Sequence, residues 1–391
     1  MNKLLKLRGF YLFLGLAGGS FGPYLTLLLV HNGLDSGQIG LLMATGTLIA
    51  IVIQPMWGII SDRYNQTRLV LILSVAVPAV LAVFYRSEYF IVLMMVYTVS
   101  TIFSSTQAPI ADSYAIAAAR REGATYGSIR LMLSIGAAVG GYAGGRYVST
   151  FSESTIWLPF LLLNAVAVAL ALTLPRQAEE NHMMSQSFAQ GVKQLIKNRV
   201  FLAFLGGSFL VNQTMTAFGT YFVLAFQSVG GSTQYAGIAL FIASFTNVPS
   251  MFFASKVIRK LGRERTLLIG ALIYVLRWGI QVIFPYPAVM IGVQVLHGVS
   301  FGLFYISAVE YVSQITSSDM QATGQSIFNM VFSGFAGIMG NLLNGYLLNQ
   351  GGVNAMNLSC MISSAVGAVL LVYVSRSSSR RLPVMQGDVS A

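Results

Sequence analysis

Charged residues are scarce in this chain of 391 residues, at 9% of the total. Soluble globular proteins carry about 25%, so this composition cannot provide a water-exposed surface for a protein of this length. Hydrophobic residues, by contrast, reach 55%. The composition therefore excludes a soluble enzyme and a disordered chain, and it indicates that lipid surrounds most of the protein.

Cysteine is nearly absent, since Cys360 is the only one and lies in an apolar run. A single cysteine cannot form an internal disulfide or a cysteine-based metal cluster, which excludes a disulfide-stapled secreted domain. The sequence also has no nucleotide-binding loop. We therefore expect no metal and no other cofactor.

Twelve apolar stretches, separated by charged or turn-rich breaks, make up most of the sequence. Each is long enough to cross a bilayer as a helix, the form in which a backbone pairs its own polar groups in lipid. The expected spans are 7–31, 37–61, 69–85, 89–117, 127–149, 156–174, 199–228, 235–255, 267–284, 288–313, 323–348 and 354–376.

Acidic residues are outnumbered, 12 against 23 lysines and arginines, which gives a net charge of +11. Once the spans are placed, most of the basic residues fall in the tails and loops on the side of the N-terminus. This asymmetry predicts a multi-pass protein of a cell membrane with both termini in the cytoplasm, and it fits a bacterial inner membrane. The excess of basic residues therefore indicates how the chain is oriented in the membrane. We expect a lipid bilayer, and no nucleic acid, among the partners.

The two halves of the sequence resemble each other at a constant offset of 197 residues. The loop 58–68 falls on 255–265, and Gly127 falls on Gly324, without gaps. Repeated six-helix halves are typical of secondary transporters, which bind their solute at mid-membrane between the repeats. Short basic loops between spans can also look alike without a repeat, and that alternative stays open.

The expected fold is an all-α integral membrane protein with twelve transmembrane helices in two pseudo-symmetric six-helix bundles. We expect this protein to function as a monomer. Its expected parts are an N-terminal bundle over 1–174, a cytoplasmic central loop over 175–198, a C-terminal bundle over 199–376 and a cytoplasmic tail over 377–391.

Five charged or titratable side chains lie well inside the expected spans. A charge at the bilayer centre costs at least about 2.5 kcal/mol on insertion scales, so it normally faces a partner or a water-filled cavity. Two of the five, Asp112 and Arg130, lie at similar depths on neighbouring spans and can form an ion pair; a structural bridge that never meets solute is the alternative. The five are Asp112, Arg130, Arg277, His297 and Glu310.

The other three side chains are less constrained by the sequence. Arg277 has no carboxylate on its own span, so we expect its neighbour to be His297 of the next span or a solute oxygen; alternatively, it extends toward an interface. His297 can carry a proton or donate a hydrogen bond, or it is a packed core residue. Glu310 lies close to the repeat position of Asp112, or it caps a loop at the interface.

The loop after the second span resembles a signature of the major facilitator superfamily. It reads Gly58-x-x-x-Asp62-Arg63-x-x-x-x-Arg68. In that superfamily a carboxylate at a helix end, held by arginines and helix dipoles, stabilises one state of a gate. The resemblance implies that Asp62, Arg63 and Arg68 form this gate, although the second-half copy has Arg259 in place of the aspartate.

Further motifs are similar to the lactose-permease-like branch of the superfamily, which includes nucleoside and phenylpropionate proton symporters. The resemblance implies that the pair of Asp112 and Arg130 holds the solute, that Asn247 and His297 contact it, and that Arg277 takes part in proton coupling. The matching runs are 54–62, 108–130, 251–254 and 296–298.

Three positions depart from that branch. Ser300 stands where the permease has a proton-carrying glutamate, Ser244 replaces a carboxylate, and Ala137 replaces the tryptophan that stacks on galactose. Galactoside specificity is therefore not expected, and a proton would take a different route. The proton-coupling candidates are Asp112, His297 and Glu310.

We therefore expect a secondary active transporter that works by alternating access, couples to protons and moves a small polar solute such as a sugar or nucleoside. Proton-antiport efflux of drugs or metabolites by the same fold is the alternative, since the glycine-rich fifth span resembles an antiporter signature in which Gly141 replaces the usual proline. An enzyme is not expected, because the external loops hold few acidic residues, while a lipid flippase stays open. The residues expected to bind solute are Asp112, Arg130, Asn247, Arg277 and His297.

Overall fold

The described part of the chain is helical throughout, and it contains no strand. The all-helical fold class expected from the hydropathy pattern is therefore confirmed. The expected central loop and C-terminal tail lie largely outside the described residues. The computed structural model describes residues 3–64, 66–175, 195, 197–316 and 321–379.

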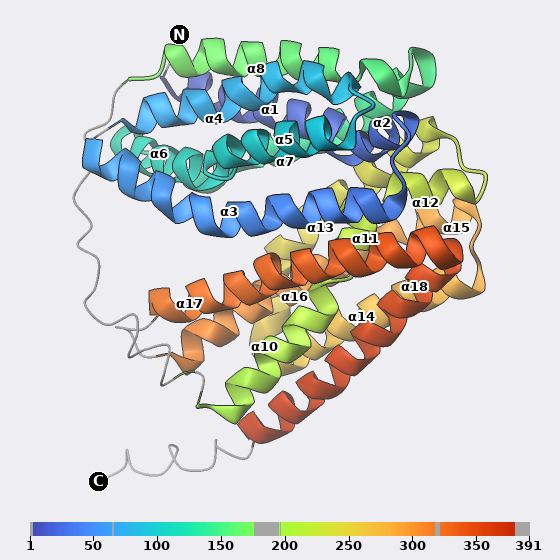
Figure 1. The fold of residues 1–391 in the computed structure, drawn as a ribbon. Coiled ribbons are helices and arrows are strands. Elements are labelled where there is room, and N and C mark those ends of the chain that lie inside the picture. The colour runs from blue at the N-terminus through green and yellow to red at the C-terminus, as the bar shows by residue number, and fades with distance from the viewer. Residues whose placement is uncertain (1–2, 65, 176–194, 196, 317–320, 380–391) are drawn as a thin grey trace.

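The first half of the chain forms the helices that run from blue to green in Figure 1. Pro55 and Pro78 lie inside two of them, α3 and α4, where a missing backbone N–H bends a helix. The elements are α1 Lys3–Phe21, η1 Gly22–Tyr24, α2 Leu25–His31, α3 Ser36–Tyr64, α4 Thr67–Leu81, η2 Ala82–Arg86, α5 Phe90–Ser104, α6 Gln107–Glu122, α7 Tyr126–Thr150, η3 Glu153–Thr155 and α8 Trp157–Leu172.

The second half begins with Asn198, whose side chain accepts hydrogen bonds from the backbone N–H groups of Val200 and Phe201 and so caps α10. The last helix, α18, covers the end of the eleventh expected span and the whole of the twelfth, because only Gly352, with φ of +67°, is non-helical inside it. The elements are α10 Arg199–Asn212, α11 Met215–Gly219, α12 Phe222–Ser228, α13 Thr233–Leu261, α14 Arg263–Ile283, α15 Pro287–Gly292, α16 Gln294–Ile315, α17 Gln321–Asn329, the π-helical η5 Met330–Phe335 and α18 Ala336–Ser379.

The described residues contain ten stretches that are long and apolar enough to cross a membrane. One of them, 323–377, covers two of the expected spans. The fifth expected span, α7, is not among the ten because its glycines, Arg130 and Arg146 lower its hydropathy. At 25 residues it is still longer than the ~30 Å hydrocarbon core requires. A multi-pass membrane protein is therefore established, and the count of twelve crossings stays a prediction.

Within the described residues, six of the expected spans depart from a continuous α-helix. The third ends in the 3-10 helix η2, the eleventh contains the π-helical η5, and four others are interrupted. The first span is broken at Gly22–Tyr24, the fourth between Ser104 and Gln107, the seventh after Asn212 and after Gly219, and the tenth at Val293. Broken helices leave backbone polar groups free, which membrane proteins tolerate only where these groups are buried in protein or line a cavity. The breaks therefore indicate where the polar interior lies.

Helices of the two halves lie in separate groups in Figure 1, one above the other, and meet along two seams. α7 packs on α13, and α3 packs on α18. A Cβ at Gly145 would lie 3.0 Å from the Cα of Gly237, and a Cβ at Gly345 would lie 3.2 Å from the Cα of Gly40. Gly40 and Gly237 are 197 residues apart, the offset of the sequence repeat, and their partners Gly145 and Gly345 are 200 residues apart, so the two seams lie at nearly equivalent positions of the two halves.

A buried tyrosine hydroxyl completes each seam. The Tyr24 hydroxyl donates to the carbonyl oxygen of Gly141 at 2.5 Å, and the Tyr221 hydroxyl donates to that of Asn341 at 2.8 Å. These tyrosines are also 197 residues apart. The seams lie toward the helix ends next to the loop 32–35, so the two halves touch on the side expected to face outward.

The glycines of α7 have a packing role. Gly136 and Gly140 face α1, and a Cβ at Gly140 would overlap the carbonyl of Leu16. Small residues let membrane helices approach closely. Contacts of α7 with α1 and, through Gly141 and Gly145, with α13 therefore account for the glycine-rich run that resembles an antiporter signature.

Candidate functional site

Asp112 and Arg130 form an ion pair between α6 and α7. One guanidinium nitrogen, Nη1 of Arg130, donates to Oδ1 of Asp112 at 2.6 Å and to Oδ2 at 2.8 Å. The hydroxyl of Tyr11, on α1, donates to Oδ1 at 2.9 Å. The Asp112 side chain is 27% exposed and that of Arg130 is 39% exposed. The pair that the sequence predicted is therefore present, and both of its side chains are partly exposed.

Arg277 lies in the core of the second half with no part of it exposed. Its guanidinium stacks over the rings of Trp278 and Phe218, with its carbon 4.4 and 5.1 Å from their centroids. Nη2 donates to Oε1 of Gln294 at 3.3 Å. Among the described residues no carboxylate pairs with Arg277, and its Nε and Nη1 have no partner. A full positive charge is therefore held by neutral and aromatic groups.

His297 shares the same aromatic neighbour. Its ring lies 3.9 Å from the Phe218 ring, centroid to centroid, and the residue is only 6% exposed. Nδ1 of His297 and Oδ1 of Asn247 are buried without a partner among the described residues. The structure thus brings Arg277 and His297 together against Phe218, as the sequence predicted for this pair of spans.

Asn247 lies on the helix that faces His297. A Cβ at Gly298, the residue after His297, would lie 2.6 Å from the backbone nitrogen of Asn247. α13 and α16 are therefore in close contact at this level. Asn247, Arg277 and His297 come from three helices of the second half, and Asp112 and Arg130 come from the first half.

Glu310 has a different environment. Its carboxylate Oε2 lies 3.5 Å from Nε of Arg263, and the two side chains are 35% and 40% exposed. Arg263 begins α14, next to a basic loop of the expected cytoplasmic side. Glu310 therefore forms a surface ion pair near one end of the protein.

The expected gate residues are only partly described. Asp62 and Arg63 lie in the last turn of α3, and their side chains lie outside the described part of the structure. Nη2 of Arg68, at the start of α4, donates to the backbone carbonyl of Leu172, the last residue of α8. A cation at a helix C-terminus is favourable because the unpaired carbonyls there carry partial negative charge. Arg68 therefore links the ends of α4 and α8.

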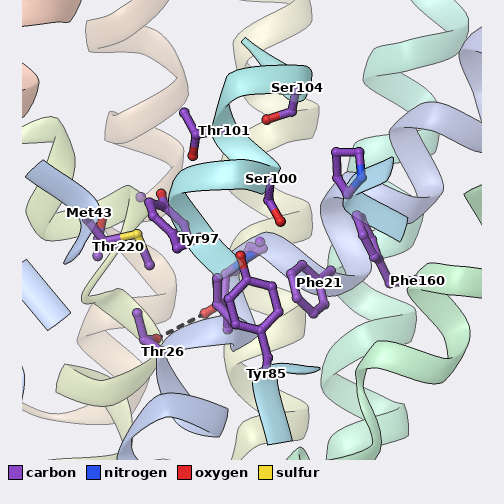
Figure 2. A pocket seen from close by; sticks show the side chains of 15 residues that line it. Phe21, Thr26, Met43, Tyr85, Tyr97, Ser100, Thr101, Ser104, Phe160 and Thr220 are labelled. Carbon is purple, nitrogen blue, oxygen red and sulfur yellow. Dashed lines mark hydrogen bonds between the residues drawn. The ribbon is translucent and has the colours of Figure 1, made fainter. Parts of the chain in front are cut away.

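A cavity of about 370 Å³ lies in the first half, between α1–α2, α3, α4–η2, α5 and α8, and Gly219 and Thr220 at the end of α11 also line it (Figure 2). None of its 15 lining residues is charged, and none of the site residues expected from the sequence is among them. A search of the sequence for charged residues in the spans does not find this cavity, because its polar groups are hydroxyls on several different helices. The usable signal in the sequence is a row of hydroxyl residues with helical spacing in the fourth span, at Tyr97, Ser100, Thr101 and Ser104.

Comparison with known proteins agrees with this architecture. Residues 4–358 match the model of the MFS_1 like family. The chain is 27% identical to the uncharacterized transporter YwbF of Bacillus subtilis, over 98% of this chain and 96% of the relative. It is 28% identical to the maltose permease of Geobacillus stearothermophilus, over 94% of this chain and 93% of the relative.

The fold also matches solved structures. The crystal structure of the nucleoside transporter NupG superposes with a TM-score of 0.80 at 18% identity, covering 96% of this chain and 99% of that one. This similarity establishes the arrangement of the helices, and the family match covers most of the sequence. The expected resemblance to the major facilitator superfamily is confirmed, and the chain belongs to the MFS_1 like family of membrane transporters.

Proposed function

We propose that this transporter is a proton-coupled secondary carrier that moves a small polar solute, such as a sugar or a nucleoside, by alternating access. The observation that carries the proposal is the ion pair of Asp112 and Arg130, which joins two neighbouring expected spans and is partly exposed. Costly intramembrane charges mark solute or ion pathways by default. Two similar proteins are a maltose permease and a nucleoside transporter, which supports this class of solute.

The solute-binding residues come from both halves of the chain. Asp112 and Arg130 offer charge-assisted hydrogen bonds from the first half. Asn247, Arg277 and His297 offer unpaired polar atoms from the second half. A solute that touches both sets joins the two bundles, so its binding energy can favour their movement relative to each other. Asp62, Arg63 and Arg68 are proposed to control the gate.

Proton coupling is assigned to Asp112, His297 and Glu310 as candidates. Asp112 is the simplest, because a proton on its carboxylate neutralises the partner of Arg130. The guanidinium is then free to donate to a solute oxygen. Release of the proton on the other side restores the ion pair and weakens the hold on the solute. This exchange couples the two movements without a cofactor.

The placement in the cell follows from the charges. The basic residues of the tails and loops support a cell membrane, here a bacterial inner membrane, with both termini in the cytoplasm. No nucleic acid is needed as a partner, and one chain holds both halves of the proposed site. We therefore propose a monomer as the working unit.

Uptake by the purified chain in liposomes tests the proposal. Labelled sugars and nucleosides are offered with and without an inward proton gradient, and accumulation is expected only with the gradient. Arg130→Ala is expected to lose at least about tenfold in solute affinity, since it leaves the Asp112 charge unpaired. Arg86→Ala, an exposed arginine, is the matched control. Uptake that ignores the gradient, or wild-type affinity in Arg130→Ala, contradicts the corresponding part of the proposal.

A further inference from the structure

The cavity of Figure 2 is bounded by three of the interrupted helices. Gly22 and Pro23 belong to the break of the first span, Ser104 ends α5, and Gly219 and Thr220 lie at a break of the seventh span. Non-helical backbone at membrane depth is tolerated where it is buried in protein or lines a cavity. The interruptions of the fold therefore converge on this chamber, as expected for a binding site.

One face of α5 lines the cavity with hydroxyl groups. Ser100 and Thr101 follow Tyr97 by three and four residues and precede Ser104 by four and three, so all four lie on one side of the helix, and their side chains are seen together in Figure 2. Within the described residues, no side chain or backbone group hydrogen-bonds the hydroxyls of Tyr97, Thr101 and Ser104. Free hydroxyls inside a membrane protein are costly, and a hydroxylated ligand would satisfy them.

The rest of the lining is largely aromatic and apolar, and its remaining hydroxyls belong to Thr26, Tyr85 and Thr220. The rings of Phe21 and Phe160 are stacked with centroids 4.3 Å apart, and Leu25, Met43 and Pro78 extend the apolar surface. No lining residue is charged. An ionic ligand would lose its hydration there without gaining a counter-charge.

We infer that this cavity is a binding site for an uncharged, hydroxylated ring of the size of a sugar unit. Its volume of about 370 Å³ lies in the usual range for small-molecule sites, about 300–1,000 Å³. Hydroxyls both donate and accept, so the α5 row matches the hydroxyls of the ring edge, while the apolar wall covers the C–H face. The inference rests on the proposed function and deepens it, since it names the solute class.

The cavity is separate from the ion pair. Ser104 ends α5, Asp112 lies on α6 beyond the break between the two helices, and neither Asp112 nor Arg130 lines the cavity. A ring held in the cavity and the ion pair therefore contact different parts of the solute. The cavity selects the ring of the solute, and the ion pair binds another part of it and responds to the proton.

Binding measurements on the purified full-length chain test this inference. The probes are glucose, galactose, maltose and sucrose, compared with glucuronate and galacturonate, which add a carboxylate to the same rings. At least one neutral sugar is expected to bind, and the uronates at least about tenfold more weakly. Equal binding of a hexose and its uronate overturns the inference.

Single-atom variants locate the bound ring. Tyr97→Phe, Thr101→Val and Ser104→Ala each remove one hydroxyl, and each is expected to weaken neutral-sugar binding about two- to tenfold. Tyr373→Phe, at a tyrosine that is 49% exposed, is the control. Thermal unfolding of each variant verifies that it is folded.

The outcomes separate this inference from the proposed function. If the three variants bind sugar as the wild type does while Arg130→Ala does not, the cavity is not the sugar site and the proposed function stands. If sugar binds in the cavity but is never transported, the proposed function fails and the inference stands. If no neutral sugar binds, the inference fails, and nucleoside uptake then decides the proposed function.

Discussion

Nη1 of Arg130 reaches both carboxylate oxygens of Asp112, at 2.6 and 2.8 Å, from the neighbouring helix. Tyr11 holds one of these oxygens from a third helix. The pair is therefore fixed from α1, α6 and α7, yet both of its side chains remain partly exposed. Fixed geometry with access is what a carboxylate needs in order to exchange a proton and return to the same partner.

Asp112→Asn is expected to abolish accumulation driven by a proton gradient, because an amide cannot take up the proton. Exchange of labelled for unlabelled solute across the liposome, which needs no net proton movement, is expected to persist. The two assays are run on the same liposomes. Accumulation at the wild-type level in this variant removes Asp112 from the proton route.

Glu310→Gln provides the comparison among the candidates. Glu310 pairs with Arg263 where both side chains are more than a third exposed, and exposed pairs contribute about 0–1 kcal/mol. We expect nearly unchanged stability and retained proton-driven accumulation, measured as for Asp112→Asn. Loss of accumulation with intact exchange would instead place the proton at Glu310.

Arg277→Met is expected to abolish uptake without lowering the thermal stability of the protein. The arginine is fully buried and unpaired with any described carboxylate, and replacing such a charge by an apolar side chain of similar volume is often neutral or stabilising. The unfolding temperature should therefore stay equal or rise, while uptake is lost. A marked fall in unfolding temperature would show that the stacks with Phe218 and Trp278 outweigh the cost of burying the charge.

Gly40→Ala and Gly237→Ala are expected to weaken closure of the two seams. A Cβ at Gly40 would lie 2.5 Å from the carbonyl oxygen of Asn341, and one at Gly237 would lie 3.1 Å from that of Gly141. The two halves must then separate locally, so transport should slow, more strongly for Gly40. Gly18→Ala, where an added Cβ meets no atom within 4 Å, is the control.

Access to the cavity reports whether the seams have opened. Thr26 lines the cavity and is 0% exposed, so Thr26→Cys in a Cys360→Ser background should react slowly with a membrane-impermeant maleimide. Adding Gly40→Ala is expected to speed that reaction several-fold. An unchanged labelling rate would mean that the seam adjusts without opening.

Arg68→Ala is expected to slow transport while leaving solute affinity unchanged. The arginine binds the terminal carbonyl of α8 from the start of α4, far along the chain from the solute-binding residues. Its loss frees the two helix ends to move apart in one state. The measurement is initial uptake rate against concentration, and a change confined to the half-saturating concentration would contradict a role in the gate.

The ion pair could be predicted from the sequence because its formation depends mainly on how deep each of the two residues lies in the membrane. Asp112 and Arg130 lie on consecutive spans near the same connecting loop, so their heights in the membrane follow from helix geometry. The partner of Arg277 could not be predicted in the same way. Gln294 lies one turn before His297, on the same face of α16, and only packing decides which of the two the guanidinium reaches.

The sequence by itself determined that lipid surrounds most of this protein, that its chain is helical, which family it belongs to, and that energetically unfavourable charges lie in the spans. Those properties follow from composition, periodicity and local spacing. The tertiary structure decided that Arg277 lies among neutral groups, that glycine pairs close two repeat-related seams, and that a charge-free cavity lies apart from the ion pair. These features arise from side chains on helices distant in sequence, whose rotation and depth are fixed only when the bundles pack.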